Sequence, residues 1–577
     1  MKSRAIFYIL CVFALMTLSA QAEEAPSLRR PIAVCAMESS VLVGNRNGTV
    51  TLVDLLTKKV TAETQVAKQL SSLVPLADAK SFLATDDAAH ELLVLCLDKQ
   101  GVQRTAAVPV SPYPVTVRVT SNGQRATVAS LWSRRLSIYQ LADDAAPKIE
   151  RVVDLPFAPR EQAILPGDQQ LVVFDSFGGR LAVVEIATGK ITLQREFPGH
   201  AVRGLALSPD GKMLLASHQM LNPFAHVNRS DMHWGLLMSN DLRWMRLSSL
   251  LDVDTELYAG GQVHPCGVPG RGGGDPAGTA VTRDGIVVVC LGGVNQVMIG
   301  TKQDLSLLPI NVGRRPTAVA ISTDDKFAIV ANTFDDSLSL VDLATKQVTD
   351  TISLGKSPER TIVERGEELF HDATYSHEGW MSCHSCHTDG HSNFTRNDNL
   401  SDGGFGAPKL VISLLGRKDT APFAWNAGTA DLPAQVRSSI HSTMQSDRKT
   451  VSEEEVAAIA AYVESLAAPP SVAELRGTTD KPSIARGRAI FERSDCAKCH
   501  AGPAFTATTL EDVGVKDELG SRRFNPPVLS GVGQRDVLLH DGRVKSLESL
   551  FLEQRHPHGD ELPADDVRDL AAYLRSL

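Results

Sequence analysis

Short apolar segments separated by polar turns recur along the chain from about residue 31 to residue 356. Apolar and polar residues alternate in these segments, as expected of half-buried β-strands. The clearest unit contains four of them, at 315–321, 327–332, 337–342 and 351–355. Units start near residues 31, 69, 111, 156, 198, 274 and 314, about one per 40 residues. The pattern predicts an all-β, seven-bladed propeller over residues 23–357.

The last unit resembles the YVTN family of propeller repeats. The likeness rests on the turn at 322–326, repeated as Ser-Pro-Asp-Gly-Lys at 208–212, and on the strand pair at 327–332 and 337–342. The resemblance implies a scaffold and says little about activity. We therefore expect the blades to be a docking platform.

The fifth unit is much longer than the others, because an insertion of more than fifty residues lies at about 218–274. It contains His218, His226, His233, Trp234, Trp244, His264 and Cys266. Long insertions on such scaffolds tend to be functional. These side chains either pack the insertion's own small core, or the insertion closes over a partner domain and His218 or His233 reaches its active site.

After residue 357 the alternation of apolar and polar residues ends, and the sequence contains two copies of one predicted helical unit. Of sixteen histidines, ten lie in this last part. Each copy opens with Arg-Gly-x-x-x-Phe, at 365–370 and 486–491, and closes with a predicted helix that carries an apolar stripe. We predict two all-α cytochrome c-like domains, 358–468 and 469–577.

Each copy also contains a C-x-x-C-H motif, the pattern of covalent haem c attachment. The first consists of Cys383, Cys386 and His387, and the second of Cys496, Cys499 and His500. Two cysteines on one helical turn can each form a thioether to a haem vinyl group, and the next residue is then the proximal iron ligand. A Cys₄ zinc site is the alternative, but more than a hundred residues separate the pairs. The motifs favour two haem c groups, with His387 and His500 as iron ligands.

Residues 358–577 resemble the bacterial dihaem cytochrome c peroxidases and their MauG-type relatives. The likeness rests on the tandem motifs, the Arg-Gly-x-x-x-Phe openings, Trp425 in the first copy and His540-Asp541-Gly542-Arg543 in the second. It implies that one haem takes electrons and the other reacts with hydrogen peroxide, with Trp425 between them. It also allows a bound calcium ion. Without the resemblance, ordinary core packing is the favoured interpretation of Trp425.

The sequence departs from this family at the expected distal acid, where Thr443 stands. Threonine cannot move a proton at neutral pH, so peroxidase activity is in doubt. His441 could replace the acid as a catalytic proton shuttle, or His441 or Met444 could be the sixth ligand of the first iron. For the second iron the candidates are His556 and His558.

The first residues predict export. Lys2 and Arg4 precede an apolar run, and Ala20-Gln21-Ala22 reads as a cleavage site, so residues 1–22 are a predicted signal peptide and the mature protein is periplasmic. No later segment is long and apolar enough to span a membrane. Of nine cysteines, Cys35, Cys96, Cys266 and Cys290 remain after the leader and the motifs are set aside, and a disulfide among them is open.

Composition excludes some partners. With 58 basic and 67 acidic residues the formal net charge is -9, which argues against nucleic-acid binding. The leading hypothesis is a periplasmic dihaem oxidoreductase acting on peroxide or an oxidisable substrate, with a small soluble redox protein or protein substrate docking on the propeller or the haem face. The alternative is a non-catalytic dihaem electron-transfer protein with a propeller binding module.

Overall fold

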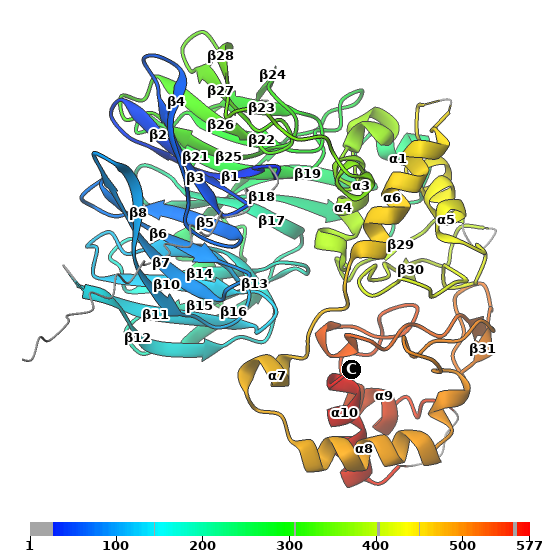
Figure 1. Ribbon diagram of the computed structural model, residues 1–577. Coiled ribbons are helices and arrows are strands. Elements are labelled where there is room, and N and C mark those ends of the chain that lie inside the picture. Colours follow the sequence, from blue (N-terminus) through cyan, green and yellow to red (C-terminus); the bar gives the residue numbers. More distant parts are fainter. Residues whose placement is uncertain (1–26, 143–144, 305–306, 401–403, 449, 558–561) are drawn as a thin grey trace, which may run out of the picture.

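The structure is a computed structural model that describes residues 27–142, 145–304, 307–400, 404–448, 450–557 and 562–577. The predicted signal peptide lies outside the described residues. A ring of β-sheets forms the N-terminal part, and a helical C-terminal part packs against it (Figure 1).

The ring has seven blades, each a four-stranded antiparallel sheet whose strands follow chain order. The first strands of the blades begin within three residues of the predicted starts, so the seven-bladed propeller is confirmed. The strands of blades one to four are β1 (Pro31–Ala36), β2 (Ser40–Asn45), β3 (Thr49–Asp54), β4 (Lys59–Gln65), β5 (Leu70–Pro75), β6 (Ser81–Asp86), β7 (Glu91–Asp98), β8 (Gly101–Pro109), β9 (Pro114–Val119), β10 (Arg125–Ser130), β11 (Arg135–Ala142), β12 (Ala145–Asp154), β13 (Pro159–Ile164), β14 (Gln170–Asp175), β15 (Arg180–Glu185) and β16 (Ile191–Glu196). Those of blades five to seven are β17 (His200–Leu207), β18 (Met213–Leu221), β19 (Met238–Arg246), β20 (Gln262–Pro265), β21 (Pro276–Val281), β22 (Val287–Leu291), β23 (Gln296–Gly300), β24 (Leu308–Asn311), β25 (Pro316–Ile321), β26 (Phe327–Asn332), β27 (Ser337–Asp342) and β28 (Gln347–Ser353).

Hydrophobic side chains fill the spaces between neighbouring blades. Each of the seven blade-to-blade contacts has its own buried cluster, including the contact between blade seven and blade one, where Ile329 packs with Val41. The ring is closed by hydrogen bonds as well: the Arg30 N–H donates to Asp336 Oδ1 at 2.7 Å, and Thr333 Oγ1 donates to the Pro31 carbonyl at 2.8 Å. The apolar alternation of the sequence thus builds one continuous ring of cores.

The predicted insertion at 218–274 is only partly an insertion, because β19 and β20 of blade five lie within it. The extra residues form two connections, 222–237 with helix α1 (Arg229–His233) and 247–261 with helix α2 (Leu247–Leu251). The first connection packs on the helical part: Val227 and Met232 share a buried cluster with Trp380 and Met381.

The C-terminal part contains two helical units. The helices of the first are α3 (Ile362–Phe370), α4 (Cys383–Cys386), α5 (Leu432–Ser438) and α6 (Glu453–Ser465); those of the linker and the second unit are α7 (Val472–Arg476), α8 (Lys481–Arg493), α9 (Leu547–Leu552) and α10 (Ala564–Arg575). Each unit also has one two-stranded ladder, β29 (Arg396–Asn397) with β30 (Lys409–Leu410) and β31 (Glu511–Asp512) with β32 (Arg523–Phe524). The predicted helical region is confirmed, with these ladders added.

Close helix packing explains the glycine in each Arg-Gly-x-x-x-Phe opening. Helix α3 crosses α6 at Gly366, where a β-carbon would stand 1.9 Å from the Ala458 carbonyl oxygen, and α8 crosses α10 at Gly487, where it would stand 2.0 Å from the Asp569 carbonyl oxygen. Only glycine allows these close approaches. Within the described residues, no helix is both long and apolar enough to cross a bilayer.

Candidate haem sites

The first C-x-x-C-H motif forms the short helix α4 and the residue after it. Cys383, Cys386 and His387 line one cavity with about 1490 Å³ of empty space. His387 Nδ1 donates to the Ile412 carbonyl at 2.8 Å, which leaves Nε2 for a metal. Burial lowers the pKa of His387 to about 4, so the ring is neutral, the form that binds iron.

The propeller holds this motif through buried hydrogen bonds. Asp275, just before β21, accepts bonds from Ser382 Oγ and Ser385 Oγ, both at 2.7 Å. His200 Nε2 at the start of β17 donates to the Ser385 carbonyl at 2.8 Å, and Gln219 Nε2 donates to Ser385 Oγ at 3.0 Å. The propeller face at which its inner strands begin is therefore covered by the chain's own haem-motif unit.

The rest of the first cavity is lined by apolar side chains, hydroxyls and amides, and by the cations Lys409 and Arg417. Met444 is buried and lines it, with Met381 and Thr443. His441 is exposed and does not line it, so the predicted roles of His441 as proton shuttle or ligand have no geometric support. No carboxylate lines this cavity among the residues the structure describes.

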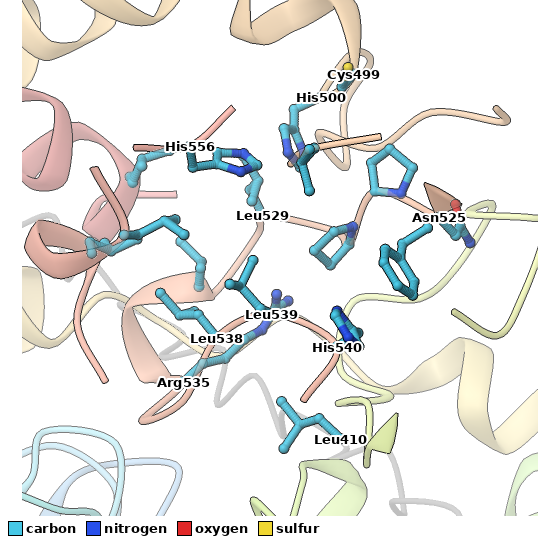
Figure 2. Close-up of a pocket in the computed structure, with 18 of the residues that line it drawn as sticks. Leu410, Cys499, His500, Asn525, Leu529, Arg535, Leu538, Leu539, His540 and His556 are labelled. Atoms are coloured by element: carbon cyan, nitrogen blue, oxygen red, sulfur yellow. The ribbon is translucent and has the colours of Figure 1, made fainter. Parts of the chain in front are cut away.

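The second motif lines a separate cavity with about 1430 Å³ of empty space. His500 Nδ1 donates to the Phe505 carbonyl at 3.1 Å, and burial lowers the pKa of His500. His556 lines the same cavity, and the His500 and His556 ring centroids are 6.5 Å apart (Figure 2). The structure thus brings one of the two predicted sixth ligands to the site; His558 lies outside the described residues.

A third histidine, His540, lines the far side of this cavity (Figure 2). Its ring stacks on Phe524 with centroids 4.0 Å apart, and its buried Nε2 has no hydrogen-bond partner among the described residues. Burial lowers the pKa of His540, so it is neutral at pH 7. The ring of Trp425 meets His540 edge-on at 6.4 Å.

The two cavities share a wall. Residues that line both are Leu410, Val411, Ile412, Arg417 and Trp425. Trp425 is held in this wall by its Nε1, which donates to the Leu410 carbonyl at 2.8 Å. The structure thus places Trp425 between the two predicted haem sites.

Two arginines, Arg417, which is buried, and Arg535, which is half-buried, test whether haem fits these cavities. Arg417 Nε donates to the Ser413 carbonyl at 3.0 Å, and Arg535, which lines the second cavity, donates to the Val528 carbonyl at 2.5 Å. Among the described residues neither guanidinium has a carboxylate ion-pair partner, and burial lowers the pKa of Arg417 to about 9 and that of Arg535 to about 10. Buried cations need an anionic partner, and the propionates of haem are such anions. The residues present fit the group.

No sequence pattern singles out these arginines or Asp275, because an isolated charged residue usually lies at the surface. The sequence left open whether the insertion closes over a partner domain and whether His218 or His233 reaches its active site. The insertion does pack on the first haem-motif unit. Neither His218 nor His233 lines either cavity: His218 is buried inside the propeller against Phe197, and His233 contacts Glu378. No disulfide joins any of the eight described cysteines.

Known proteins share this second part of the chain. Residues 360–494 match the family model of the di-haem cytochrome c peroxidases. This chain is 26% identical over 265 residues to the cytochrome c551 peroxidase of Nitrosomonas europaea, an alignment that covers 37% of this chain and 79% of that protein. It is 28% identical over 113 residues to the cytochrome c peroxidase Ccp of Escherichia coli, which covers 16% of this chain and 24% of that protein.

Among solved structures, the hydrazine synthase of Kuenenia stuttgartiensis aligns with a TM-score of 0.48 and 20% identity, over 56% of this chain and 99% of that one. The peroxidase-family match supports a dihaem oxidoreductase and implies haem c. It ends just before Cys496, so the second haem rests on the second motif and its cavity.

Proposed function

We propose that this chain is an exported dihaem c-type oxidoreductase that passes electrons between two haems and on to hydrogen peroxide or another redox substrate. The observation that carries the proposal is the shared wall, in which Trp425 and Arg417 line both cavities. Haem c, when bound, supplies one-electron redox chemistry whose potential depends on axial ligands and surroundings. The chain's own residues set those conditions.

The cavity walls suggest different ligand sets for the two sites. His387 and Met444 line the first, and His500 and His556 line the second. A His/Met pair raises the reduction potential relative to a bis-histidine pair. The first haem would then be the higher-potential centre.

Proton movement has more support at the second site. Glu511 and the unpartnered His540 Nε2 lie there, whereas the described wall of the first cavity offers hydroxyls such as those of Ser439 and Thr443 and no carboxylate. Peroxide cleavage needs a group that moves a proton. These residues favour the second cavity for that step.

The propeller has a narrower role than a general docking platform. One face is engaged by the first haem-motif unit through Asp275 and His200, so a small soluble redox protein or protein substrate would dock on the haem face or on the remaining propeller surface. Export to the periplasm rests on the predicted leader.

Electron paramagnetic resonance of the haem-loaded protein, fully ferric and then half-reduced, tests the enzyme function. A high-spin signal in either state, followed by peroxide-dependent oxidation of both haems, is the expected result. A haem that is low-spin in the wild type should become high-spin in the matching variant, Met444→Ala for the first haem or His556→Ala for the second, whereas the matched control His441→Ala should change neither. Absence of any high-spin species and of peroxide consumption in the wild type would rule out the enzyme function.

A non-catalytic electron-transfer protein is the second candidate. It is favoured by Met444 and His556, because each lines the cavity of its own proximal histidine and could close the sixth position. Two low-spin signals in both redox states, with electron exchange to a soluble cytochrome but no turnover of peroxide, would establish it.

A further inference from the structure

A cluster of metal-binding side chains lies away from both haem cavities, where the propeller insertion meets the first haem-motif unit. His233 ends helix α1 of the insertion, and His377 and Glu378 lie in a short 3-10 turn before the first motif. One ligand atom from each of the three lies within 4.8 Å of the other two. Each side chain is half-buried, so solvent can still reach the cluster.

The separations suit a metal ion. His233 Nδ1 lies 2.9 Å from Glu378 Oε1, and His377 Nε2 lies 3.7 Å from the same oxygen. With metal–ligand bonds of about 2 Å, donor atoms around a tetrahedral ion stand roughly 3.3 Å apart. The observed distances bracket that value.

The surroundings orient the donors. His377 Nδ1 contacts Asp447 Oδ1 at 2.8 Å, which leaves Nε2 free to face the cluster; a carboxylate behind the ligating imidazole is the usual support of a metal-bound histidine. Glu378 has a φ of 53°, and its Oε2 accepts a bond from the Gly270 N–H at 2.9 Å. The insertion's glycine loop therefore fixes the carboxylate toward His233.

The charge also favours a cation. Glu378 and Asp447 contribute two negative charges, and Arg229, with Nη1 3.2 Å from Asp447, contributes one positive charge. Together these three charged side chains leave one net negative charge beside the imidazoles. A divalent ion would be attracted to it.

We propose that His233, His377 and Glu378 bind a divalent transition-metal ion, of which Zn²⁺ best matches the two-histidine, one-carboxylate donor set. Water completes the coordination. The ion ties the propeller insertion to the first haem-motif unit, and it is independent of the haem irons and of the proposed function.

The test uses the full-length, haem-loaded protein after treatment with a chelator. Zn²⁺ is titrated in competition with a chromophoric chelator, and bound zinc is counted by elemental analysis. We expect one zinc per chain, at least tenfold weaker binding in His377→Ala and in Glu378→Gln, and about 10–100-fold weaker binding in Asp447→Asn. Zinc X-ray absorption should show two imidazole ligands in the wild type.

His226→Ala is the matched control. It lies on the same insertion and pairs with Asp398 of the haem-motif unit at 2.8 Å, so it removes an imidazole–carboxylate contact across the same interface without touching the cluster. It should bind zinc like the wild type. If His377→Ala loses its haem spectrum, His233→Gln replaces it, because that side chain belongs to the propeller. Equal zinc binding by the wild type and the Glu378→Gln variant, or no stoichiometric zinc in the wild type, would overturn the proposal.

Discussion

Arg417 is one buried side chain that faces two predicted redox centres. Its guanidinium lines both cavities and has no carboxylate partner among the described residues. Reduction adds an electron to a haem, and a nearby cation stabilises the reduced form. Arg417→Met should therefore lower both reduction potentials, on the order of 60 mV, which corresponds to about tenfold in a one-electron equilibrium. Potentiometric titration of the two haem bands measures the change.

The neighbouring Lys418 provides the control. It carries the same charge but is exposed, and water and salt screen an exposed charge. Lys418→Met should leave both potentials nearly unchanged. Equal shifts in the two variants would show that Arg417 acts only through the protein's overall charge.

Trp425 carries a prediction about electron passage. It lines both cavities and is fixed by its hydrogen bond to the Leu410 carbonyl. Trp425→Phe removes that bond and part of the ring between the sites, so inter-haem electron transfer should slow by about tenfold or more, equivalent to about 1.4 kcal/mol of barrier. Rapid-mixing kinetics on half-reduced protein measure the rate. The exposed Trp234 of the insertion is the control, and an unchanged rate in Trp425→Phe would remove the bridging role.

At the scale of single residues, the sequence predicts the site residues that lie close together in the chain. The C-x-x-C-H spacing places two thiols and an imidazole on one turn, so His387 and His500 follow directly from the motif. Distal residues come from chain segments far away, and their placement depends on tertiary packing. Met444 and His556 reach their cavities, His441 does not, and Arg417 has no local pattern that would single it out.

Helix α4 is the element on which the two halves of the molecule meet. The carboxylate of Asp275 accepts bonds from the hydroxyls of Ser382 and Ser385, and both serines are almost fully buried. Asp275→Ala leaves two buried donors unsatisfied, at about 1–3 kcal/mol each. We expect a clear fall in the midpoint of the thermal transition that releases the haem domain, measured by calorimetry.

Asp275→Asn separates this effect from simple packing, because its amide oxygen still accepts one of the two bonds. Its transition should lie between those of the wild type and the alanine variant. Asp254→Ala, on an exposed loop of the insertion, should be neutral. If the alanine and asparagine variants are equally stable, the hydrogen bonds to α4 do not hold the haem motif.

Element by element, the strand pattern predicts the propeller well and the insertion poorly. The alternation of apolar and polar residues repeats in every blade because each inner strand packs against neighbours on both sides. The starts of all seven blades can therefore be identified in the amino-acid sequence. The third and fourth strands of blade five are hard to recognise in the sequence. The connections at 222–237 and 247–261, which separate β18, β19 and β20, are far longer than the usual turn. Periodicity read in short windows cannot join strands across such gaps.

On the scale of the whole molecule, buried histidines connect the propeller to the haem part. His200 bonds to the Ser385 carbonyl, and His391 packs edge-on against Phe177 of the propeller at 4.8 Å while its Nε2 lies 3.3 Å from the Gln534 carbonyl. Burial lowers the pKa of each to about 4. Both rings are therefore neutral in the folded protein at pH values where an unfolded histidine is already charged.

The sign of the resulting pH dependence follows from linkage. An unfolded histidine takes up its proton near pH 6.5, whereas the folded one does so only near pH 4, so unfolding consumes protons between these values. The stabilisation is fully present above pH 6.5 and is lost as the pH falls toward 4, by about 1.4 kcal/mol per pH unit for each histidine. We expect acid to separate the haem part from the propeller before the blades unfold, because both rings lie at that contact.

Unfolding of His200→Gln, followed from pH 7 to pH 4, should show a slope smaller by about one proton, since the amide can still donate to Ser385 but does not titrate. If His200→Gln keeps the wild-type slope, His200 is not one of the groups that couple acid to this contact.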